Sequence, residues 1–281
     1  RITILRTNSY MTIWIIVALL GIIEGFTEFL PISSTGHLIL AEYWLKLPSE
    51  EFSNLFNIII QLAAILAVVV YFYRQLAPWA APTPEACKET WRLWQKVFVG
   101  LVPAVVIGLL LGDHIEKHLM RADVVAGALV IGGVLLIFIE KKKHTNRYQS
   151  VADFTFRFAL IVGFIQCIAM IPGTSRSAAT ILGALLMGAS RKAAAEYSFF
   201  LAIVTMGAAS AYALLKAAPH FHTIEWGPLC VGFIVSFLIA LASIAFLMRY
   251  IQRHDFKLFG YYRIVLGLII CVACLTKWIQ I

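Results

Sequence analysis

The sequence has few charged residues for its length. They make up 14% of its 281 residues, against about 25% in an average soluble domain. Hydrophobic residues make up 61%, against about 45–50% in soluble domains. A chain of this composition is expected to have the lipid bilayer as its main solvent.

The few charges are also unbalanced in sign. The net charge is +8, which in a soluble protein would raise the question of a nucleic-acid partner. Here the basic residues cluster in loops between apolar runs, where anionic lipid head groups and a cytoplasmic location account for them. We therefore expect membrane lipids, and no nucleic acid, among the partners.

The five cysteines lack the spacing of a disulfide framework. Their number is odd, Cys87 lies in a polar loop, and the other four lie in apolar runs. The pair Cys271 and Cys274 has a spacing found in redox and metal sites, but in an apolar run it is more typical of small buried residues.

Six apolar runs have the length of about 17–25 residues that a helix needs to cross a bilayer. They are Asn54–Tyr73, Lys96–Gly112, Ala122–Glu140, Ala194–Leu215, Gly227–Met248 and Leu258–Trp278. The sequence thus predicts an all-α polytopic membrane protein with six transmembrane helices.

Two further apolar regions, Thr12–Lys46 and Phe154–Gly188, are each interrupted at the centre by proline and a cluster of Gly, Ser and Thr. Proline removes a backbone donor and stops a helix, and each half is short for a full crossing. We interpret each region as a re-entrant helix–loop–helix hairpin, which is tolerated where protein or a wet cavity surrounds the loop.

The predicted order is hairpin, three spans, hairpin, three spans. Because three is odd, the second hairpin enters from the opposite face, and the halves, about 12–140 and 154–279, form an inverted repeat whose loop tips meet near the midplane. A weak echo agrees, since Pro31-Ile-Ser33-Ser34 resembles Pro172-Gly-Thr174-Ser175. The basic loop 141–153 joins the halves into one membrane domain, 11–281. Residues 1–10, before Met11, are interpreted as an N-terminal extension, from which no function is inferred.

The distribution of Lys and Arg predicts the orientation. In this topology fourteen of these residues lie on one side of the membrane and seven on the other. The richer side, which includes the loop 141–153, is expected to be cytoplasmic. The first hairpin and both termini then lie outside.

The first hairpin contains two carboxylates. Glu24 and Glu28 are four residues apart and share one helical face, and two like charges at membrane depth do not both stay ionised without a cation or a shared proton. Either a divalent cation, Mg²⁺ or Ca²⁺, binds them with substrate phosphate completing its shell, or one carboxyl is protonated and acts as acid or base. Bracing of the hairpin is the competing interpretation.

Hydroxyl groups and a histidine follow in the first loop. One of Ser33, Ser34 and Thr35 is expected to cap the helix after Pro31. All three together with His37 favour catalysis or phosphate contact.

The second loop supplies a cation. Arg176 offers a planar fork of donors that suits phosphate oxygens, and the amides at the start of the next half-helix favour an anion. A structural pairing of Arg176 with one of the two glutamates is the competing interpretation. The neighbouring residues are small or bear hydroxyl groups: Gly173, Thr174, Ser175, Ser177 and Thr180.

The apolar runs also contain polar residues, among them Gln61, Gln166 and Arg263. Gln61 and Gln166 would either line the site or form hydrogen bonds between helices. Arg263, beside Tyr261 and Tyr262, is expected to be an interfacial anchor whose charge reaches the head groups.

These motifs resemble the paired signatures of the bacterial undecaprenyl-diphosphate phosphatase family, which is associated with bacitracin resistance. The resemblance runs from about Trp14 to the C-terminus and rests on Glu24-x-x-x-Glu28, Pro31-x-Ser33-Ser34-Thr35-Gly36-His37 and Pro172-Gly173-x-Ser175-Arg176-Ser177-x-x-Thr180. It implies hydrolysis of undecaprenyl diphosphate, a polyprenyl diphosphate lipid, to undecaprenyl phosphate and inorganic phosphate. This reaction recycles the lipid carrier of peptidoglycan synthesis. It also implies the bacterial inner (plasma) membrane, and the distribution of Lys and Arg predicts a site open to the periplasmic or outer side.

The resemblance also implies roles. Ser34 is the expected nucleophile, activated by Glu28 or His37, while attack by His37 or by water that it activates is the alternative. Glu24 and Glu28 would hold the cation or position Ser34, and Arg176 would stabilise phosphoryl charge. The other residues of the two loops and their motifs would bind substrate: Ser33, Thr35, Gly173, Thr174, Ser175, Ser177 and Thr180. Gln61 and Gln166, which lie outside the motifs, would bind substrate if they line the site.

A different class of function stays open. Inverted repeats with broken helices at the midplane also bind anions in secondary transporters, so a lipid or anion transporter is the alternative. Ser34 and His37 beside two carboxylates exceed what binding requires, and we therefore predict an enzyme. A homodimer is left open.

Overall fold

The computed structural model describes residues 2–142, 146–217 and 225–276. Their regular secondary structure is helical, apart from one isolated bridge between Tyr148 and Ala189. The helices are α1 (Ile2–Thr27), α2 (Ser34–Trp44), α3 (Glu50–Tyr71), α4 (Tyr73–Leu76), η1 (Pro78–Ala80), α5 (Pro84–Leu119), α6 (Ala122–Lys141), η2 (Val151–Asp153), α7 (Phe156–Gln166), η3 (Cys167–Met170), α8 (Arg176–Leu186), α9 (Arg191–Ala217), α10 (Trp226–Tyr250) and α11 (Lys257–Leu275).

Six of the described helices are long and apolar enough to cross a membrane, namely α3, α5, α6, α9, α10 and α11. They confirm the six predicted runs and make the chain an all-α, multi-pass membrane protein. Some helices begin or end at other residues than predicted. For example, α3 begins at Glu50 and not at Asn54, because Ser49 caps it: Ser49 Oγ accepts a hydrogen bond from Phe52 N at 3.2 Å. The predicted end of the last run, Trp278, lies outside the described residues.

Proline interrupts the two other apolar regions as predicted. Residues 28–33, the first loop, separate α1 from α2, and residues 171–175, the second loop, follow η3 and precede α8. The expectation of short halves is right for α2, α7 and α8, which have 11 residues each. It is also right for the apolar part of α1, Thr12–Thr27, although α1 as a whole has 26 residues because the segment before Met11 continues the same helix.

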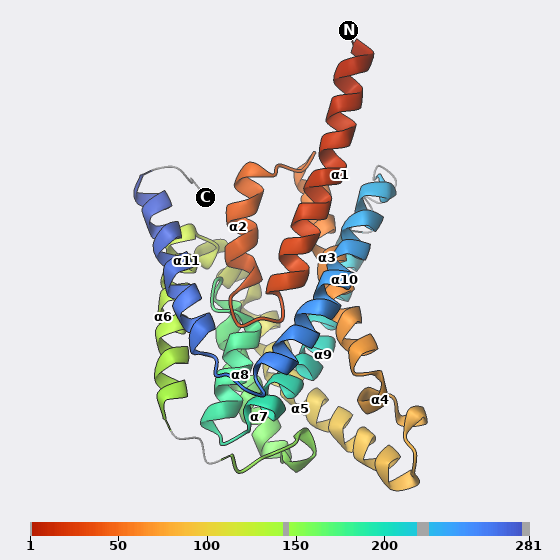
Figure 1. Ribbon diagram of the computed structural model, residues 1–281, viewed down its shortest axis with the longest axis vertical. Helices are drawn as coiled ribbons and strands as arrows, with labels where there is room; N and C mark the ends of the chain where they lie inside the picture. The colour runs from red at the N-terminus through yellow and green to blue at the C-terminus, as the bar shows by residue number, and fades with distance from the viewer. Residues whose placement is uncertain (1, 143–145, 218–224, 277–281) are drawn as a thin grey trace.

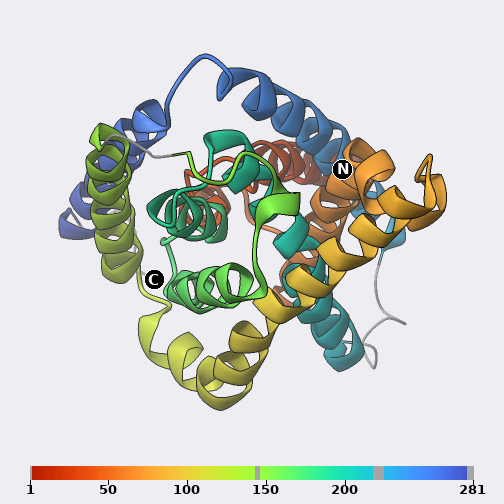
Figure 2. The ribbon, with the colours of Figure 1, turned by 90° about the horizontal axis from the view of Figure 1, so that it is seen from below.

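The two helix–loop–helix pairs lie at the centre of the molecule. In Figure 1 α1 and α2 occupy the upper half, with the first loop at mid-height, and α7 and α8 lie in the lower half. Seen from below, α7 and α8 lie inside a ring of longer helices (Figure 2). This arrangement brings the two loops together from opposite ends.

Close helix packing sets the position of α11. A Cβ added at Gly133 of α6 would lie 2.6 Å from the carbonyl oxygen of Gly260 in α11, so only small residues allow this approach. Towards the other end of α6, the buried Glu140 carboxylate pairs with Arg191 of α9 at 2.7 Å and accepts a hydrogen bond from Phe256 N, just before α11. These contacts fix α6 and α11 relative to each other.

Candidate active site

Each loop ends on a serine that caps the following helix. Ser33 Oγ accepts a hydrogen bond from Gly36 N at 3.4 Å, and Ser175 Oγ accepts one from Ala178 N at 3.2 Å. Both serines have a positive φ, 73° and 69°, which costs a non-glycine residue about 1–3 kcal/mol. In capping role and in φ, Ser33 therefore matches Ser175, one position after Thr174, which the sequence echo aligns with Ser33.

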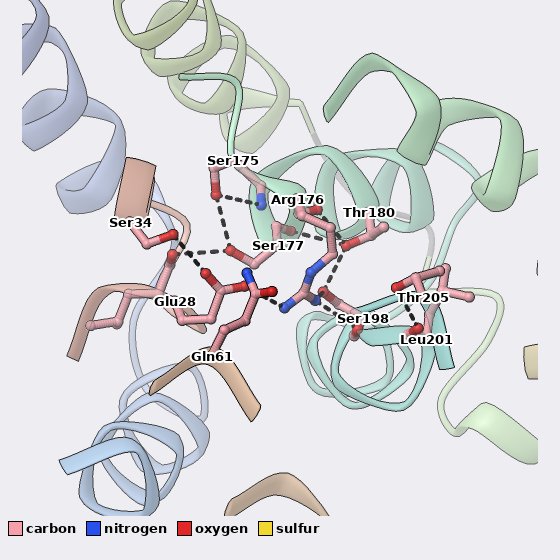
Figure 3. A network of polar contacts seen from close by, with 12 residues as sticks. Glu28, Ser34, Gln61, Ser175, Arg176, Ser177, Thr180, Ser198, Leu201 and Thr205 are labelled. Atoms are coloured by element: carbon pink, nitrogen blue, oxygen red, sulfur yellow. Dashed lines mark hydrogen bonds and ion pairs between the residues drawn. The ribbon is translucent and has the colours of Figure 1, made fainter. Parts of the chain in front are cut away.

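One carboxylate joins the two loops. Glu28 Oε1 lies 3.2 Å from Nη2 of Arg176, and Glu28 Oε2 accepts a hydrogen bond from Ser34 Oγ at 2.6 Å (Figure 3). Because both side chains of the ion pair are largely buried, the attraction between them is screened little by water. A hydroxyl, a carboxylate and a guanidinium thus meet at one point.

The Arg176 guanidinium is oriented by α9. Its Nη1 donates to the carbonyl oxygen of Ser198 at 2.9 Å and to Ser198 Oγ at 3.2 Å. Thr180 Oγ1 lies 2.6 Å from the same Ser198 hydroxyl and donates to the Arg176 carbonyl at 2.9 Å. Thr180, predicted to bind substrate, therefore braces the arginine, and Ser198 is a site neighbour that the sequence reasoning missed.

Arg176 has an unpartnered nitrogen. Its Nε is buried and has no hydrogen-bond partner among the described residues. A buried donor without a partner is costly, and an arginine fork is well suited to an anionic oxygen. This nitrogen is therefore available to a ligand.

Ser177 and Ser175 connect the loops. Ser177 Oγ donates to the carbonyl oxygen of Leu30 in the first loop at 3.0 Å, and it lies 3.0 Å from Ser175 Oγ. The hydroxyl of Ser177 is fully buried. Its role in this structure is to hold the two loops together.

His37 is held at both ring nitrogens. Nδ1 lies 2.7 Å from the carbonyl oxygen of Ser33, and Nε2 lies 2.7 Å from the hydroxyl of Tyr262, whose ring stacks on the imidazole at a centroid distance of 5.5 Å. Since a carbonyl oxygen only accepts, Nδ1 carries a proton and donates to Ser33, and in the neutral form of the ring Nε2 accepts from the Tyr262 hydroxyl. The sequence reasoning missed this contact because Tyr262 is 225 residues away.

Glu24 offers a carboxylate oxygen for a cation. It is 2% exposed, and its Oε2 has no hydrogen-bond partner among the described residues. Glu28 is already shared between Arg176 and Ser34, and no cluster of three acidic, His or Cys ligands occurs in the described part of the chain. The residues fit a divalent cation that takes most of its ligands from phosphate and water, as Mg²⁺ does.

An apolar cavity of about 510 Å³ reaches Arg176. Gln61 and Gln166 also line it. Gln61 Oε1 accepts a hydrogen bond from Ser210 Oγ at 3.3 Å, as the interhelical interpretation predicts, whereas both amide atoms of Gln166 are buried without a partner among the described residues. The Gln166 amide is therefore a second polar group available to a ligand.

The remaining predicted residues lie in the loops or beside them. Thr35, in the first turn of α2, and Thr174 are partly buried. Gly173 has φ +89°, and a Cβ there would lie 2.5 Å from the carbonyl oxygen of Val125, so its role is to let the second loop approach α6.

The prediction of Arg263 as an interfacial anchor is wrong. Its side chain is fully buried and donates to the carbonyl oxygens of Pro31, Gly173, Ala128 and Leu129. The side chain points inward because Gly132 of α6 leaves room for the guanidinium, which a Cβ at that position would strike.

Comparison with known proteins agrees with these features. A family model described as bacitracin resistance protein BacA matches residues 17–269. The undecaprenyl-diphosphatase of Limosilactobacillus fermentum is 49% identical over 90% of this chain and 94% of that protein. Undecaprenyl-diphosphatase 1 of Clostridioides difficile is 48% identical over 90% and 93%, and an undecaprenyl-diphosphatase of Enterococcus faecalis is 47% identical over 90% and 94%. With most of its length matched, the chain belongs to the BacA family of bacitracin resistance proteins.

Proposed function

We propose that this protein hydrolyses undecaprenyl diphosphate to undecaprenyl phosphate and inorganic phosphate. The reaction regenerates the lipid carrier of cell-wall synthesis and supports resistance to bacitracin. Relatives that share almost half of their residues with the chain carry the name of this activity. The observation in the structure that carries the proposal is the network of Ser34, Glu28 and Arg176.

The network suits transfer of a phosphoryl group. Ser34 Oγ attacks the terminal phosphorus, its proton passes to Glu28 Oε2, and the bond to the bridging oxygen breaks, releasing undecaprenyl phosphate. Water then attacks the phosphoserine, and inorganic phosphate leaves. Ser34 Oγ takes its proton back from Glu28, which is again a carboxylate. Direct attack by water activated at His37 is the alternative. In both routes most of the catalysis comes from positioning and charge neutralisation.

Arg176 is proposed to stabilise the charge on the transferred phosphoryl group. Its Nη1 is occupied by Ser198 and one N–H of Nη2 by Glu28, so Nε, together with the second N–H of Nη2, remains for phosphate oxygens. When bound at Glu24 and Glu28, a divalent cation, Mg²⁺ or Ca²⁺, would neutralise part of the charge of the diphosphate.

The substrate lipid is proposed to enter through the apolar cavity beside Arg176. Its lining is mostly aliphatic, from α5 and α9, and Gln166 stands among these residues with an unpartnered amide. An isoprenoid chain fits such a lining, and the Gln166 amide would then donate to the phosphate next to the chain.

We further propose that the two loops are re-entrant and that the halves form an inverted repeat. The matching serines Ser33 and Ser175, each at a positive φ and each capping an 11-residue helix, support a shared origin of the two pairs. Three membrane-spanning helices, α3, α5 and α6, lie between the pairs, so they would enter from opposite faces. The excess of Lys and Arg on one side supports a bacterial inner membrane location with the site open to the outer face.

Phosphate release by the purified protein tests the function. We expect release from undecaprenyl diphosphate in detergent, loss on addition of a chelator, and recovery with Mg²⁺ or Ca²⁺. Binding of the lipid without any phosphate release would favour a transporter instead.

Cysteine labelling tests the orientation. In a variant without the five native cysteines, a membrane-impermeant thiol reagent should label Asn146→Cys only after lysis of spheroplasts, since Asn146 lies in the basic loop. Thr35→Cys should be labelled in intact spheroplasts. Labelling of Asn146→Cys in intact cells would contradict the proposed orientation.

A further inference from the structure

Arg263 is a buried cation without an acidic partner. Its side chain is fully buried, and no ion pair joins it to a carboxylate of the described residues. All of its described hydrogen bonds go to backbone carbonyl oxygens. Nη2 donates to Gly173 at 3.1 Å and Ala128 at 3.2 Å, while Nη1 donates to Pro31 and Nε to Leu129, each at 3.4 Å.

Two of these carbonyls belong to the two loops at equivalent positions. Pro31 precedes Ser33 by two residues, and Gly173 precedes Ser175 by two residues. The two serines are the capping residues with positive φ. One guanidinium therefore binds both loops just before their strained residues, and its other two contacts tie them to α6.

A strained backbone persists only where surrounding contacts hold it. Burying a charge without a counter-charge also costs free energy. A buried arginine at this position is therefore expected to do something that a neutral side chain could not. Only a planar fork with several donors reaches four carbonyls in different directions, and the single ammonium of lysine does not.

We propose that Arg263 is a positioning residue that holds the two loops in register, so that Glu28 and Ser34, in and directly after the first loop, meet Arg176, directly after the second. The inference rests on the proposed phosphatase function of this site. Arg263 itself touches neither Ser34 nor Arg176 in any described hydrogen bond, so its effect on chemistry passes through the backbone of the loops.

Two variants disturb the guanidinium in different ways. Arg263→Lys keeps the charge but removes the fork. Gly132→Ala keeps the arginine but pushes its Nη2, because the new Cβ would collide with it. Gly127→Ala is the matched control on the same helix, since a Cβ there meets nothing within 4 Å.

We expect Arg263→Lys and Gly132→Ala each to lower kcat by roughly 100-fold, the effect of a misplacement of about 1 Å in a reacting group. KM should change by less than about 3-fold, because the groups that bind the lipid chain stay in place. Gly127→Ala should keep the kcat and KM of the parent. A kcat within about 2-fold of the parent for both site variants would overturn the proposal.

A second measurement is independent of activity. Spin labels at Thr35→Cys and Thr174→Cys, in a background without native cysteines, report the distance between the loops by electron paramagnetic resonance. The parent and Gly127→Ala should give one narrow distribution, and the two site variants a broader or shifted one. Unchanged distributions would overturn the proposal even if turnover fell. If the parent released no phosphate, the proposed function would fail, and the distances would still test the role of Arg263.

Discussion

The two loops share a backbone and differ in chemistry and burial. Ser33 and Ser175 cap helices of equal length with nearly equal φ angles. The acidic and nucleophilic candidates belong to the first pair, and the arginine belongs to the second. In α8 every residue from Ser177 to Leu185 is buried, whereas Gly36 is the only buried residue of α2.

This difference shows how one scaffold, used twice, can serve two tasks. The buried α8, supported by α9 through Ser198, holds a cation in a fixed place. The more exposed α2 carries Ser34, which donates to Glu28, and His37. The site exists only where the two meet, at the Glu28–Arg176 ion pair.

The largest effect is expected from the hydroxyl of the first loop. Ser34→Ala should reduce turnover by at least about 1000-fold if Ser34 is the nucleophile, since residual rates then come from binding and charge stabilisation alone. Phosphate release in detergent measures it. The matched Ser177→Ala, which removes the hydroxyl that joins the loops, should lose much less. If Ser34→Ala kept a turnover close to that of the parent, Ser34 would not be the nucleophile, and His37 or water would be.

The next effect concerns the cation of the second loop. Arg176→Lys should lower kcat by roughly 100-fold, because an ammonium cannot keep the Ser198 and Glu28 contacts and also donate to phosphate. Steady-state phosphate release gives kcat and KM. A loss of less than about 3-fold would mean that the fork geometry is dispensable and that charge alone suffices.

The two carboxylates should differ from each other. Glu24→Gln should raise the Mg²⁺ concentration needed for half-maximal rate by on the order of 10-fold. The reason is that a neutral amide replaces the carboxylate whose free oxygen would bind the cation. Glu28→Gln should mainly lower the maximal rate, because it disrupts the ion pair and the contact with Ser34. Rate against Mg²⁺ concentration separates the two. Identical behaviour of both variants would contradict this division.

The smallest effect tests the shared backbone. Ser33→Gly and Ser175→Gly should each raise the free energy of unfolding by about 0.5–1 kcal/mol, because glycine removes the cost of a positive φ and loses only a few tenths as a cap. Thermal unfolding in detergent measures the change. Stabilisation at one position and marked destabilisation at the other would show that the two loops are not equivalent.

Several features were predictable because they depend on neighbouring residues. The six spans follow from hydropathy, since a membrane helix satisfies its own backbone groups whatever surrounds it. Pro31 and Pro172 indicated the two loops because a proline stops a helix through its own missing N–H, independently of distant residues. The candidates Glu24, Glu28, Ser34, His37 and Arg176 were visible as polar groups in apolar surroundings, where such groups are costly.

The contacts between these candidates depended on the tertiary structure. The sequence separations between Ser198 and Arg176, Tyr262 and His37, and Arg263 and Pro31 are 22, 225 and 232 residues. Hydropathy does not predict which residues pair over such separations. The pattern around Arg263 located a charge in an apolar run but not the direction of its side chain. The small residues Gly132 and Gly133 on α6 decided that direction, since they open the space into which the guanidinium turns. Sequence alone thus determined the spans, the breaks and the candidate groups, while packing decided which groups meet, because a hydrogen bond depends on position in space.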